Sequence, residues 1–341
     1  MKNLIIFGTR PEAIKMAPLI KLLEKNKNYK TKVCNTAQHR EMTDQVLDFF
    51  NINPDYDIDI MKENQNLFDL TSEIIKNLKI ILNDFKPDNV FVHGDTTTSM
   101  AASIASFYYG ANIFHVEAGL RTNNKLSPFP EEINRQLTAR LTDYHFAPTK
   151  TSMENLTSEN ISAKNILVTG NTVIDALLYS LKIVKENPTN FIKNFEIKYR
   201  LKEVILVTCH RRENHGKGLE NICKALKKIS KINKKSLIIF PVHLNPIVQR
   251  TVKHFLSNID NIKLINPLRY QDFIWLMNRS KLILTDSGGV QEEAPSLGKP
   301  VIVMRNNTER PEAVNAGTVI LVGDNVNLIV NETLDLINNK K

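Results

Sequence analysis

The sequence predicts an α/β protein with two doubly wound domains, and three observations support this fold class. The chain has 341 residues, which is too long for one ordinary hydrophobic core. Short apolar, β-branched runs alternate with amphipathic helical patterns along its whole length. This alternation occurs twice, with six candidate strands each time, which favours two parallel sheets. We therefore expect two Rossmann-like domains that face a central cleft.

The first half contains six apolar runs that are typical of strands buried on both faces, because they are continuous rather than alternating. Helical periodicity separates them, most clearly over 12–24 and 67–82. These patterns predict an N-terminal domain over residues 1–170. The expected strands are 4–8, 31–37, 89–95, 112–119, 144–149 and 166–170.

The second half repeats the pattern and predicts a C-terminal domain over residues 203–341, with a strong helix at 218–232. Between the halves, a helical segment at 172–185 is followed by a polar stretch with Pro188. We therefore expect a linker or hinge over 171–202. The expected strands of the second half are 204–210, 237–243, 262–267, 281–289, 300–305 and 318–323.

The net charge of +9 comes largely from lysines, which are densest at 227–235. Apolar residues recur there at helical spacing, so we expect the lysines on a solvated helix face. No aromatic residues interleave with them and no nucleic-acid-binding motif occurs, which argues against a nucleic-acid partner. A basic protein would still attract a nucleotide diphosphate.

The apolar segments and the cysteines point to a cytoplasmic protein. No stretch approaches the about 20 apolar residues of a membrane-spanning helix. The first apolar run, 4–7, is shorter than a signal-peptide core. The cysteine count is odd and no Cys-x-x-Cys pair occurs. We expect Cys34, Cys209 and Cys223 to be reduced and mostly buried.

The clearest phosphate-binding signal is the segment L-T-D-S-G-G-V-Q-E-E-A at 284–294. Glycines at a strand-to-helix turn let backbone N–H groups approach an anion, and Ser287 adds a hydroxyl donor beside Gly288 and Gly289. A plain turn capped by Ser287 is the competing interpretation. No Gly-Lys-Ser/Thr or Gly-x-Gly-x-x-Gly pattern follows, so a P-loop and a nicotinamide cofactor are not indicated.

An Arg-Pro-Glu-Ala sequence occurs in each half, at 10–13 and 310–313, after a predicted strand. Pro and Glu suit a helix start for purely structural reasons. Arg10 and Arg310 would be repelled by the positive end of a helix unless an anion also lies there. Gly8 permits a tight turn just before the first copy. The repeated motif therefore favours an anionic ligand.

Three carboxylates follow separate buried strands of the first half: Asp95, Glu117 and Glu131. Ligands of open α/β sheets bind at the carboxyl ends of the strands. One such carboxylate alone could be a helix cap. Three of them favour proton transfer in a shared site. His210 follows the first strand of the second half and can shuttle a proton or bind a phosphate.

Other reaction classes fit the sequence less well. Metal-binding spacings such as His-x-x-x-His are absent from it, so we expect no metal ion and no cofactor. A Gly-x-Ser-x-Gly elbow is also absent. Cys209 belongs to a predicted strand, which disfavours a Cys–His protease.

Long motifs in order along nearly the whole chain resemble one family, the bacterial non-hydrolysing UDP-N-acetylglucosamine 2-epimerases, which have the two-domain glycosyltransferase-B fold. The similar segments are G-T-R-P-E-A-I-K-M-A-P at 8–18, T-A-Q-H-R-E-M at 36–42, H-G-D-T-T-T at 93–98, H-V-E-A-G-L-R-T at 115–122, S-P-F-P-E-E at 127–132, T-G-N-T-V-I-D at 169–175, P-V-H-L-N-P at 241–246, 286–300 and 308–314.

The resemblance implies reversible conversion of UDP-N-acetylglucosamine to UDP-N-acetylmannosamine. UDP would be eliminated to give a 2-acetamidoglucal and then added back. It also implies a homodimer, and a second UDP-N-acetylglucosamine that acts as an allosteric activator.

The family's functional residues carry over onto matching positions of this chain. The implied catalytic groups are Asp95, Glu117, Glu131 and His210. UDP and the sugar would be held by Arg10, Lys15, His210, Phe273, Ser287, Gly288, Gly289, Glu293 and Arg310. Within that set Glu293 would accept the ribose hydroxyls, Phe273 would lie beside uracil and Lys15 near the sugar. The second nucleotide sugar would contact Gln38, Arg211 and His243.

One departure from the family concerns the end of the chain. Family members usually continue into a helix that crosses back to the first domain, and we expect that helix to be missing here, which bears on activity. The alternatives are a hydrolysing epimerase, a glycosyltransferase with the same fold, an inactive UDP-sugar-binding protein, and an epimerase of a UDP-diacetamido sugar. The segment A-Q-H-R-E at 37–41 favours the simpler sugar.

Overall fold

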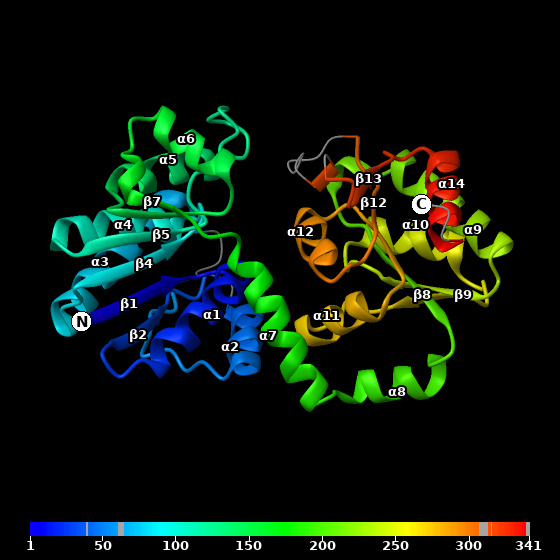
Figure 1. The fold of residues 1–341 in the computed structure, drawn as a ribbon, viewed down its shortest axis with the longest axis horizontal. Helices are drawn as coiled ribbons and strands as arrows, with labels where there is room; N and C mark the ends of the chain where they lie inside the picture. Colours follow the sequence, from blue (N-terminus) through cyan, green and yellow to red (C-terminus); the bar gives the residue numbers. More distant parts are fainter. Residues whose placement is uncertain (39, 61–64, 307–312, 315, 339–341) are drawn as a thin grey trace. The chain divides into compact units, whose positions relative to one another are not determined.

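The computed structural model describes residues 1–341 except 39, 61–64, 307–312, 315 and 339–341, and it leaves aside the side chains of 41, 42 and 212. The chain divides into two compact units, Met1–Tyr179 and Ser180–Lys341, which are called unit 1 and unit 2 below (Figure 1).

Unit 1 is built on a parallel sheet of seven strands in the order β3-β2-β1-β4-β5-β6-β7. The six strands expected from the sequence are all present. Strand β3 was not predicted, because two residues are too short to produce a pattern. The strands are β1 (Lys2–Phe7), β2 (Lys30–Asn35), β3 (Tyr56–Asp57), β4 (Asn89–His93), β5 (Asn112–Val116), β6 (Tyr144–Ala147) and β7 (Ile166–Val168).

Helices cover the sheet of unit 1, as its doubly buried strands require (Figure 1). Leu4 and Ile6 of β1 and Val90 and Val92 of β4 belong to one core cluster, together with buried residues of α3 and α4. The helices are α1 (Arg10–Lys25), α2 (Arg40–Phe50), α3 (Leu67–Phe85), α4 (Thr97–Tyr109), α5 (Glu131–Leu141) and α6 (Lys150–Ser158).

Unit 2 has a parallel sheet of six strands in the order β10-β9-β8-β11-β12-β13, and all six were expected. They are β8 (Glu203–Thr208), β9 (Ser236–Pro241), β10 (Ile262–Ile265), β11 (Leu282–Thr285), β12 (Val301–Val303) and β13 (Val319–Leu321). The helices around this sheet are α9 (Lys217–Ile232), α10 (Pro246–Leu256), α11 (Tyr270–Arg279), α12 (Gly288–Ser296) and α14 (Val326–Ile337).

The segment 171–202 contains two helices, α7 (Thr172–Glu186) and α8 (Asn190–Tyr199). Helix α8 was not predicted, because its lysines and asparagines conceal a short apolar face. Phe195 of α8 is buried, and its ring lies 5.4 Å from that of Trp275 in α11. Packing against α11 therefore stabilises a helix that local sequence indicates only weakly.

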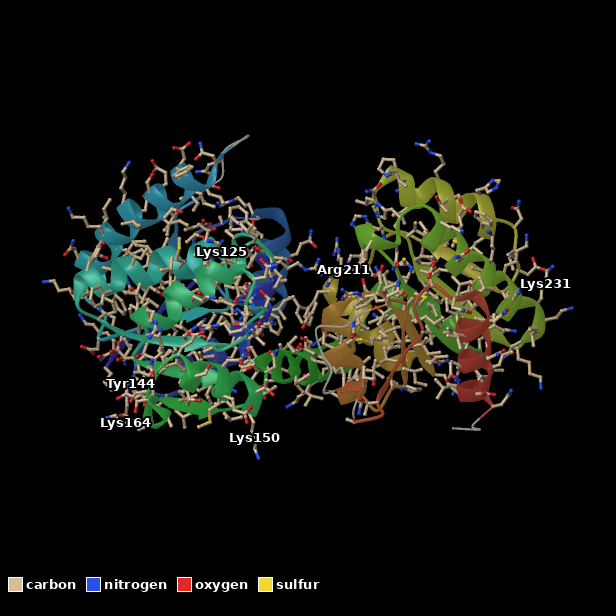
Figure 2. The ribbon with its side chains drawn as sticks, turned by 90° about the horizontal axis from the view of Figure 1, so that it is seen from above. Lys125, Tyr144, Lys150, Lys164, Arg211 and Lys231 are labelled. Carbon is tan, nitrogen blue, oxygen red and sulfur yellow. The ribbon has the colours of Figure 1, made fainter. Side chains whose placement is uncertain are left out.

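The surface and the cysteines agree with the sequence analysis. Helix α9 buries Leu219, Ile222, Leu226 and Ile229, while its lysines, such as Lys231, are exposed (Figure 2). The prediction of a solvated lysine face is therefore confirmed. All three cysteines are free and buried. Among the residues that the structure describes, no helix is long and apolar enough to span a membrane.

Each sheet has a point where the strand order reverses, and the loops after the two central strands diverge there. In unit 1 this point lies between β1 and β4, and in unit 2 between β8 and β11. Such crevices at the carboxyl ends of strands are the usual ligand sites of open α/β sheets. These two points therefore mark the candidate ligand sites of the two units.

Candidate active site

The turn after β1 requires glycine at position 8. A Cβ atom added to Gly8 would lie 2.1 Å from Thr36 Oγ1 and 2.6 Å from Thr98 Oγ1. Those two hydroxyls are themselves hydrogen-bonded at 3.0 Å. The loops after β1 and β2 and the first turn of α4 can thus approach one another this closely only because position 8 has no side chain.

A buried carboxylate, Glu12, ties the loop after β1 to the loop after β4. Its Oε2 accepts hydrogen bonds from the backbone N–H groups of Gly8, at 3.1 Å, and Thr9, at 2.8 Å. Its Oε1 accepts from Thr96 Oγ1 at 2.8 Å. The sequence explained Glu12 by the helix dipole alone. The structure shows that it also fixes both loops at the switch point of unit 1.

Glu117 follows β5 and forms a partly buried ion pair with Lys15 of α1. Its φ of 61° lies in the left-handed region, which is costly for a residue with a Cβ. Burial acts to raise the pKa of Glu117, but the positive charge of Lys15, together with His93, outweighs it and holds this pKa well below the ordinary value. Glu117 is therefore an ionised carboxylate.

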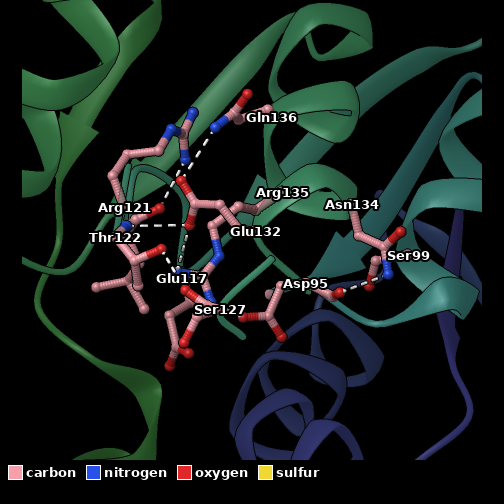
Figure 3. Close-up of polar contacts among 12 residues, drawn as sticks. Asp95, Ser99, Glu117, Arg121, Thr122, Ser127, Glu132, Asn134, Arg135 and Gln136 are labelled. Atoms are coloured by element: carbon pink, nitrogen blue, oxygen red, sulfur yellow. Dashed lines mark hydrogen bonds and ion pairs between the residues drawn. The ribbon is translucent and has the colours of Figure 1, made fainter. Parts of the chain in front are cut away.

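Asp95 follows β4 and forms an ion pair with Arg135 of α5. Arg135 is held in turn by the fully buried Glu132, with Nη1 3.3 Å from Oε2. Asn134 of the same helix donates to the backbone carbonyl of Asp95 at 3.0 Å. Figure 3 shows this chain of contacts. Helix α5 therefore fixes both the backbone and the side chain of Asp95.

Glu132 also organises the loop that precedes α5. It accepts hydrogen bonds from the backbone N–H groups of Thr122, at 3.0 Å, and Asn123, at 3.2 Å, and from Gln136 Nε2, at 3.0 Å (Figure 3). Burial acts to raise the pKa of Glu132, but these donors outweigh it and lower the pKa. The neighbouring Glu131 has a buried Oε2 without a hydrogen-bond partner in the described part of the chain.

The carboxylates predicted from the sequence thus occupy one edge of unit 1. Strands β4 and β5 are neighbours, with His93 opposite Val116, so Asp95 and Glu117 follow them at the same edge. Helix α5, which starts at Glu131, contacts Asp95 there. Gln38 lies near the same turn, where its Oε1 accepts from Thr98 Oγ1 at 3.5 Å. Arg10 is the first residue of α1 and is half-buried.

In unit 2 the fully buried Asp286 joins the loops after β8 and β11. It directly follows β11, and its oxygens accept hydrogen bonds from the backbone N–H groups of His210, at 3.0 and 3.1 Å, and Arg211, at 2.9 Å. Asn214 Nδ2 donates to it at 3.0 Å. The switch point of unit 2 therefore uses a buried carboxylate as unit 1 uses Glu12.

His210 and His243 lie together at this edge. Their rings are nearly parallel, with centroids 6.1 Å apart, and His210 Nδ1 is 3.4 Å from Asp286 Oδ1. Burial lowers the pKa of His210, and Asp286 partly offsets the effect. Arg211, half-buried beside His210, is labelled in Figure 2. The structure therefore groups one predicted catalytic residue with two that were assigned to a second nucleotide sugar.

The Ser-Gly-Gly turn opens helix α12. Ser287 occupies the N-cap position, and its backbone N–H donates to Thr285 Oγ1 at 2.9 Å. Gly289 is exposed, and a Cβ added there would lie 3.2 Å from Glu293 Oε1. The Glu293 carboxylate therefore lies beside the start of the helix.

Gly288 is the first helical residue, and Phe273 is half-buried in α11. Arg310 lies outside the described residues.

Sequence reasoning missed the residues that hold the site residues in place. His93, Arg135 and Asp286 each stand in a motif that the sequence analysis quoted or close to one, but none was given a role. The signal for Asp286 was available, because an acid directly after an apolar strand and before a turn is costly to bury without partners. Arg135 stands four residues after Glu131, on the same face of α5.

Comparison with known proteins agrees with this architecture. The UDP-N-acetylglucosamine 2-epimerase family profile matches residues 21–341. The UDP-N-acetylglucosamine 2-epimerase of Salmonella typhimurium is 54% identical over 343 residues, which cover 100% of this chain and 91% of that protein. Two solved structures are also similar.

The first is UDP-GlcNAc 2-epimerase from Neisseria meningitidis bound to UDP-GlcNAc. It has 52% identity, a TM-score of 0.87, and coverage of 100% of this chain and 92% of that chain. The second is the Methanocaldococcus jannaschii enzyme in complex with UDP-GlcNAc and UDP. It has 38% identity, a TM-score of 0.79, and coverage of 99% and 93%.

Two parallel sheets flanked by helices, in two domains that match these structures, define an α/β enzyme with a glycosyltransferase-B-like fold. The chain belongs to the UDP-N-acetylglucosamine 2-epimerase family and is an isomerase. The glycosyltransferase and inactive-binder alternatives are therefore set aside.

Proposed function

We propose that this protein interconverts UDP-N-acetylglucosamine and UDP-N-acetylmannosamine without releasing free sugar. The observation that carries the proposal is the edge of unit 1, where Asp95, Glu117 and Glu131 follow neighbouring elements and Glu117 is ionised beside Lys15. Such a set of carboxylates suits proton removal and return at carbon. The names and bound ligands of the relatives support the substrate.

The proposed course has two halves. A carboxylate takes the proton from C2 while the C1–O bond to UDP breaks, which leaves UDP and a 2-acetamidoglucal with a C1=C2 double bond. UDP then bonds to C1 again, and a proton reaches C2 from the opposite face. Positive charge that develops at C1 as UDP leaves makes the C2 proton easier to remove. The site must hold both intermediates so that re-addition is faster than escape.

Glu117 suits the acceptance of a proton rather than its donation, because its pKa lies well below the ordinary value. Asp95 is also paired with a cation, Arg135. The buried Oε2 of Glu131 has no such contact among the described residues. We assign Glu117 as a base, and Glu131, whose buried oxygen accepts no hydrogen bond from the described residues, as its acid partner in one direction of the reaction.

Unit 2 supplies the UDP side in this proposal. The Ser287 hydroxyl and the backbone N–H groups of Gly288 and Gly289 would receive the diphosphate at the start of α12, where the helix dipole favours an anion. His210 would add a further donor, and Arg10 and Arg310 two cations. Glu293 beside Gly289 would accept the ribose hydroxyls, and Phe273 would lie against uracil. Gln38, Arg211 and His243 would contact the second nucleotide sugar.

The experiment that tests this function is incubation of the purified protein with UDP-N-acetylglucosamine in deuterated water, followed by proton NMR. UDP-N-acetylmannosamine with deuterium at C2 is the expected product. Free N-acetylmannosamine with UDP would identify a hydrolysing enzyme instead. A UDP-diacetamido sugar turned over in preference to UDP-N-acetylglucosamine would contradict the substrate, and no turnover of either would contradict the activity.

Asp95→Asn and Glu117→Gln each remove a carboxylate from the proposed reacting site without removing bulk. We expect each to lower kcat at least about 100-fold, since general acid–base catalysis contributes that much or more. Calorimetry should show UDP binding within a few-fold of the unchanged protein. Glu24→Gln, at the exposed far end of α1, is the control and should keep full activity. Loss of UDP binding in either variant would contradict its assigned role.

A further inference from the structure

The imidazole of His93 is a buried group that the proposed mechanism does not yet use. His93 is the last residue of β4 and is 3% exposed. Its Nε2 has no hydrogen-bond partner among the residues that the structure describes. The atom lies 3.7 Å from Glu117 Oε2. Buried polar atoms are nearly always satisfied in folded proteins, so this nitrogen calls for an explanation.

The backbone brings Glu117 to His93 at an energetic cost. His93 is the register partner of Val116 in the adjacent strand, so Glu117 is the next residue past the pair. Its left-handed conformation, with φ of 61°, is unfavourable for a side chain with a Cβ. Residues held in such conformations concentrate at functional sites, where surrounding contacts maintain them.

Two groups approach the same oxygen atom of Glu117. Lys15 Nζ forms an ion pair with Oε2, and His93 Nε2 points at this oxygen from the end of β4. The Lys15 side chain is 17% exposed and the His93 side chain 4%. Lys15 is therefore the partner that a substrate can reach, whereas His93 is fixed within the unit.

The other charged groups near His93 do not compete for this role. His115 on β5 is fully buried, and burial lowers its pKa to about 3, so it is neutral at pH 7. Its Nε2 is already hydrogen-bonded to the Gly94 carbonyl at 2.7 Å. Among the described residues, Glu117, itself paired with Lys15, is thus the charged group in ion-pair range of His93.

We propose that His93 is a positioning residue for epimerisation, whose Nε2–H holds the Glu117 carboxylate in place when Lys15 turns its ammonium toward the bound nucleotide sugar. A shift of under 1 Å would bring the 3.7 Å separation into the hydrogen-bond range. His93 touches neither substrate nor reacting atoms, and its effect passes through Glu117. The inference rests on the function proposed above.

Variants that differ in the length and the hydrogen-bond donor of the side chain at position 93 test the proposal. His93→Leu removes the donor, His93→Asn keeps an amide that is too short, and His93→Gln places an amide N–H near the Nε2 position. We expect kcat to fall about 10- to 100-fold in the Leu and Asn variants, as for loss of a hydrogen bond to a charged group. It should fall less than about 5-fold for Gln, and KM should change little in all three. His145→Gln, a buried histidine on β6, is the matched control and should keep full kcat.

A second measurement does not depend on activity. In protein labelled with ¹³C at the glutamate carboxyls, the Glu117 signal is assigned by its loss in Glu117→Gln and then titrated. Its pKa should rise in His93→Leu and stay unchanged in His145→Gln. An unchanged titration in His93→Leu, or equal loss of kcat in the Leu, Asn and Gln variants, would overturn the proposal. Failure of the unchanged protein to form the epimer would contradict the proposed function and leave the titration result to decide the role of His93.

Discussion

Single residues at the edge of unit 1 are constrained by contacts that the sequence does not display. Gly8 was predicted to allow a tight turn. In the structure, the side chains of Thr36 and Thr98 pack so closely against it that a Cβ atom would not fit. Glycine is thus required here by close packing rather than by an unusual φ angle. The same packing fixes the loops after β1 and β2 against the first turn of α4.

Gly8→Ala should therefore destabilise the protein by about 1–3 kcal/mol, the usual cost of overpacking. Urea unfolding followed by circular dichroism measures this. Gly218→Ala is the matched control, because an added Cβ in α9 meets nothing closer than 3.6 Å and alanine favours a helix. That control should be neutral or slightly stabilising. Equal effects of the two substitutions would refute the packing argument.

Catalytic candidates that directly follow an apolar run were predictable from the sequence, whereas the residues that hold them in place were not. Asp95 and Glu117 stand where apolar runs stop, so local pattern alone indicated them. Arg135 and Glu132 act through contacts across about 10 to 40 residues of chain, which no local pattern encodes. His93 looked like the end of a strand, and only the pairing of β4 with β5 brings it to Glu117.

At the scale of elements, one carboxylate connects two strand–helix turns in each unit. Glu12 belongs to α1, yet it accepts hydrogen bonds from the loops that follow both β1 and β4. Because Glu12 is 1% exposed, each of these bonds is made away from water. The arrangement of the two elements around the switch point therefore depends on a single side chain.

Glu12→Gln keeps the shape of this side chain but replaces one accepting oxygen by an N–H donor. We expect the free energy of unfolding to fall by about 2–3 kcal/mol, because buried donors lose a charged acceptor. Chemical denaturation gives the value, and Glu24→Gln on the exposed end of α1 should change it by less than about 0.5 kcal/mol. If Glu12→Gln is as stable as the control, the hydrogen bonds of Glu12 to the two loops do not contribute to stability.

Elements with strong patterns were predicted, and those that depend on tertiary packing were not. All twelve expected strands occur, because strands buried on both faces produce continuous apolar runs. Helix α8 needs the aromatic contact of Phe195 with Trp275, which lies about 80 residues further along the chain. Two-residue β3 takes its place only by pairing with β2.

At the scale of the whole molecule, each unit has its own sheet and core, so the two can respond differently to acid. Two of the buried histidines of unit 1 lie on the neighbouring strands β5 and β6. Burial lowers the pKa of His115 to about 3 and that of His145 to about 4. Both side chains are therefore neutral in the folded protein at pH 7.

Unfolding releases these histidines to ordinary pKa values near 6.5, so the unfolded chain binds more protons below that pH. We expect the stability of unit 1 to be complete above pH 6.5 and to decrease as the pH falls toward 4. Amide hydrogen exchange, measured separately for the two units at pH 7 and pH 5, would report this loss of stability in unit 1. His145→Gln should reduce the pH dependence, and an unchanged dependence would exclude this histidine as a cause.

The family and its fold were recognisable from the motifs alone, because long runs of similar residues extend in order along the chain. Helix and strand patterns added the division into two halves. The cleft between the two units stays a prediction of the sequence.

The two buried acids, Glu12 and Asp286, accept hydrogen bonds from main-chain N–H groups of the loops after β1 and β8. They also accept from side chains that include Thr96 and Asn214. Loop side chains other than these donors could thus be exchanged while the scaffold beneath them keeps its shape. Retargeting toward differently decorated nucleotide sugars would then start from the loops after β1, β4, β8 and β11, with both acids retained. Libraries that preserve these two anchors should give more folded variants than libraries that randomise them.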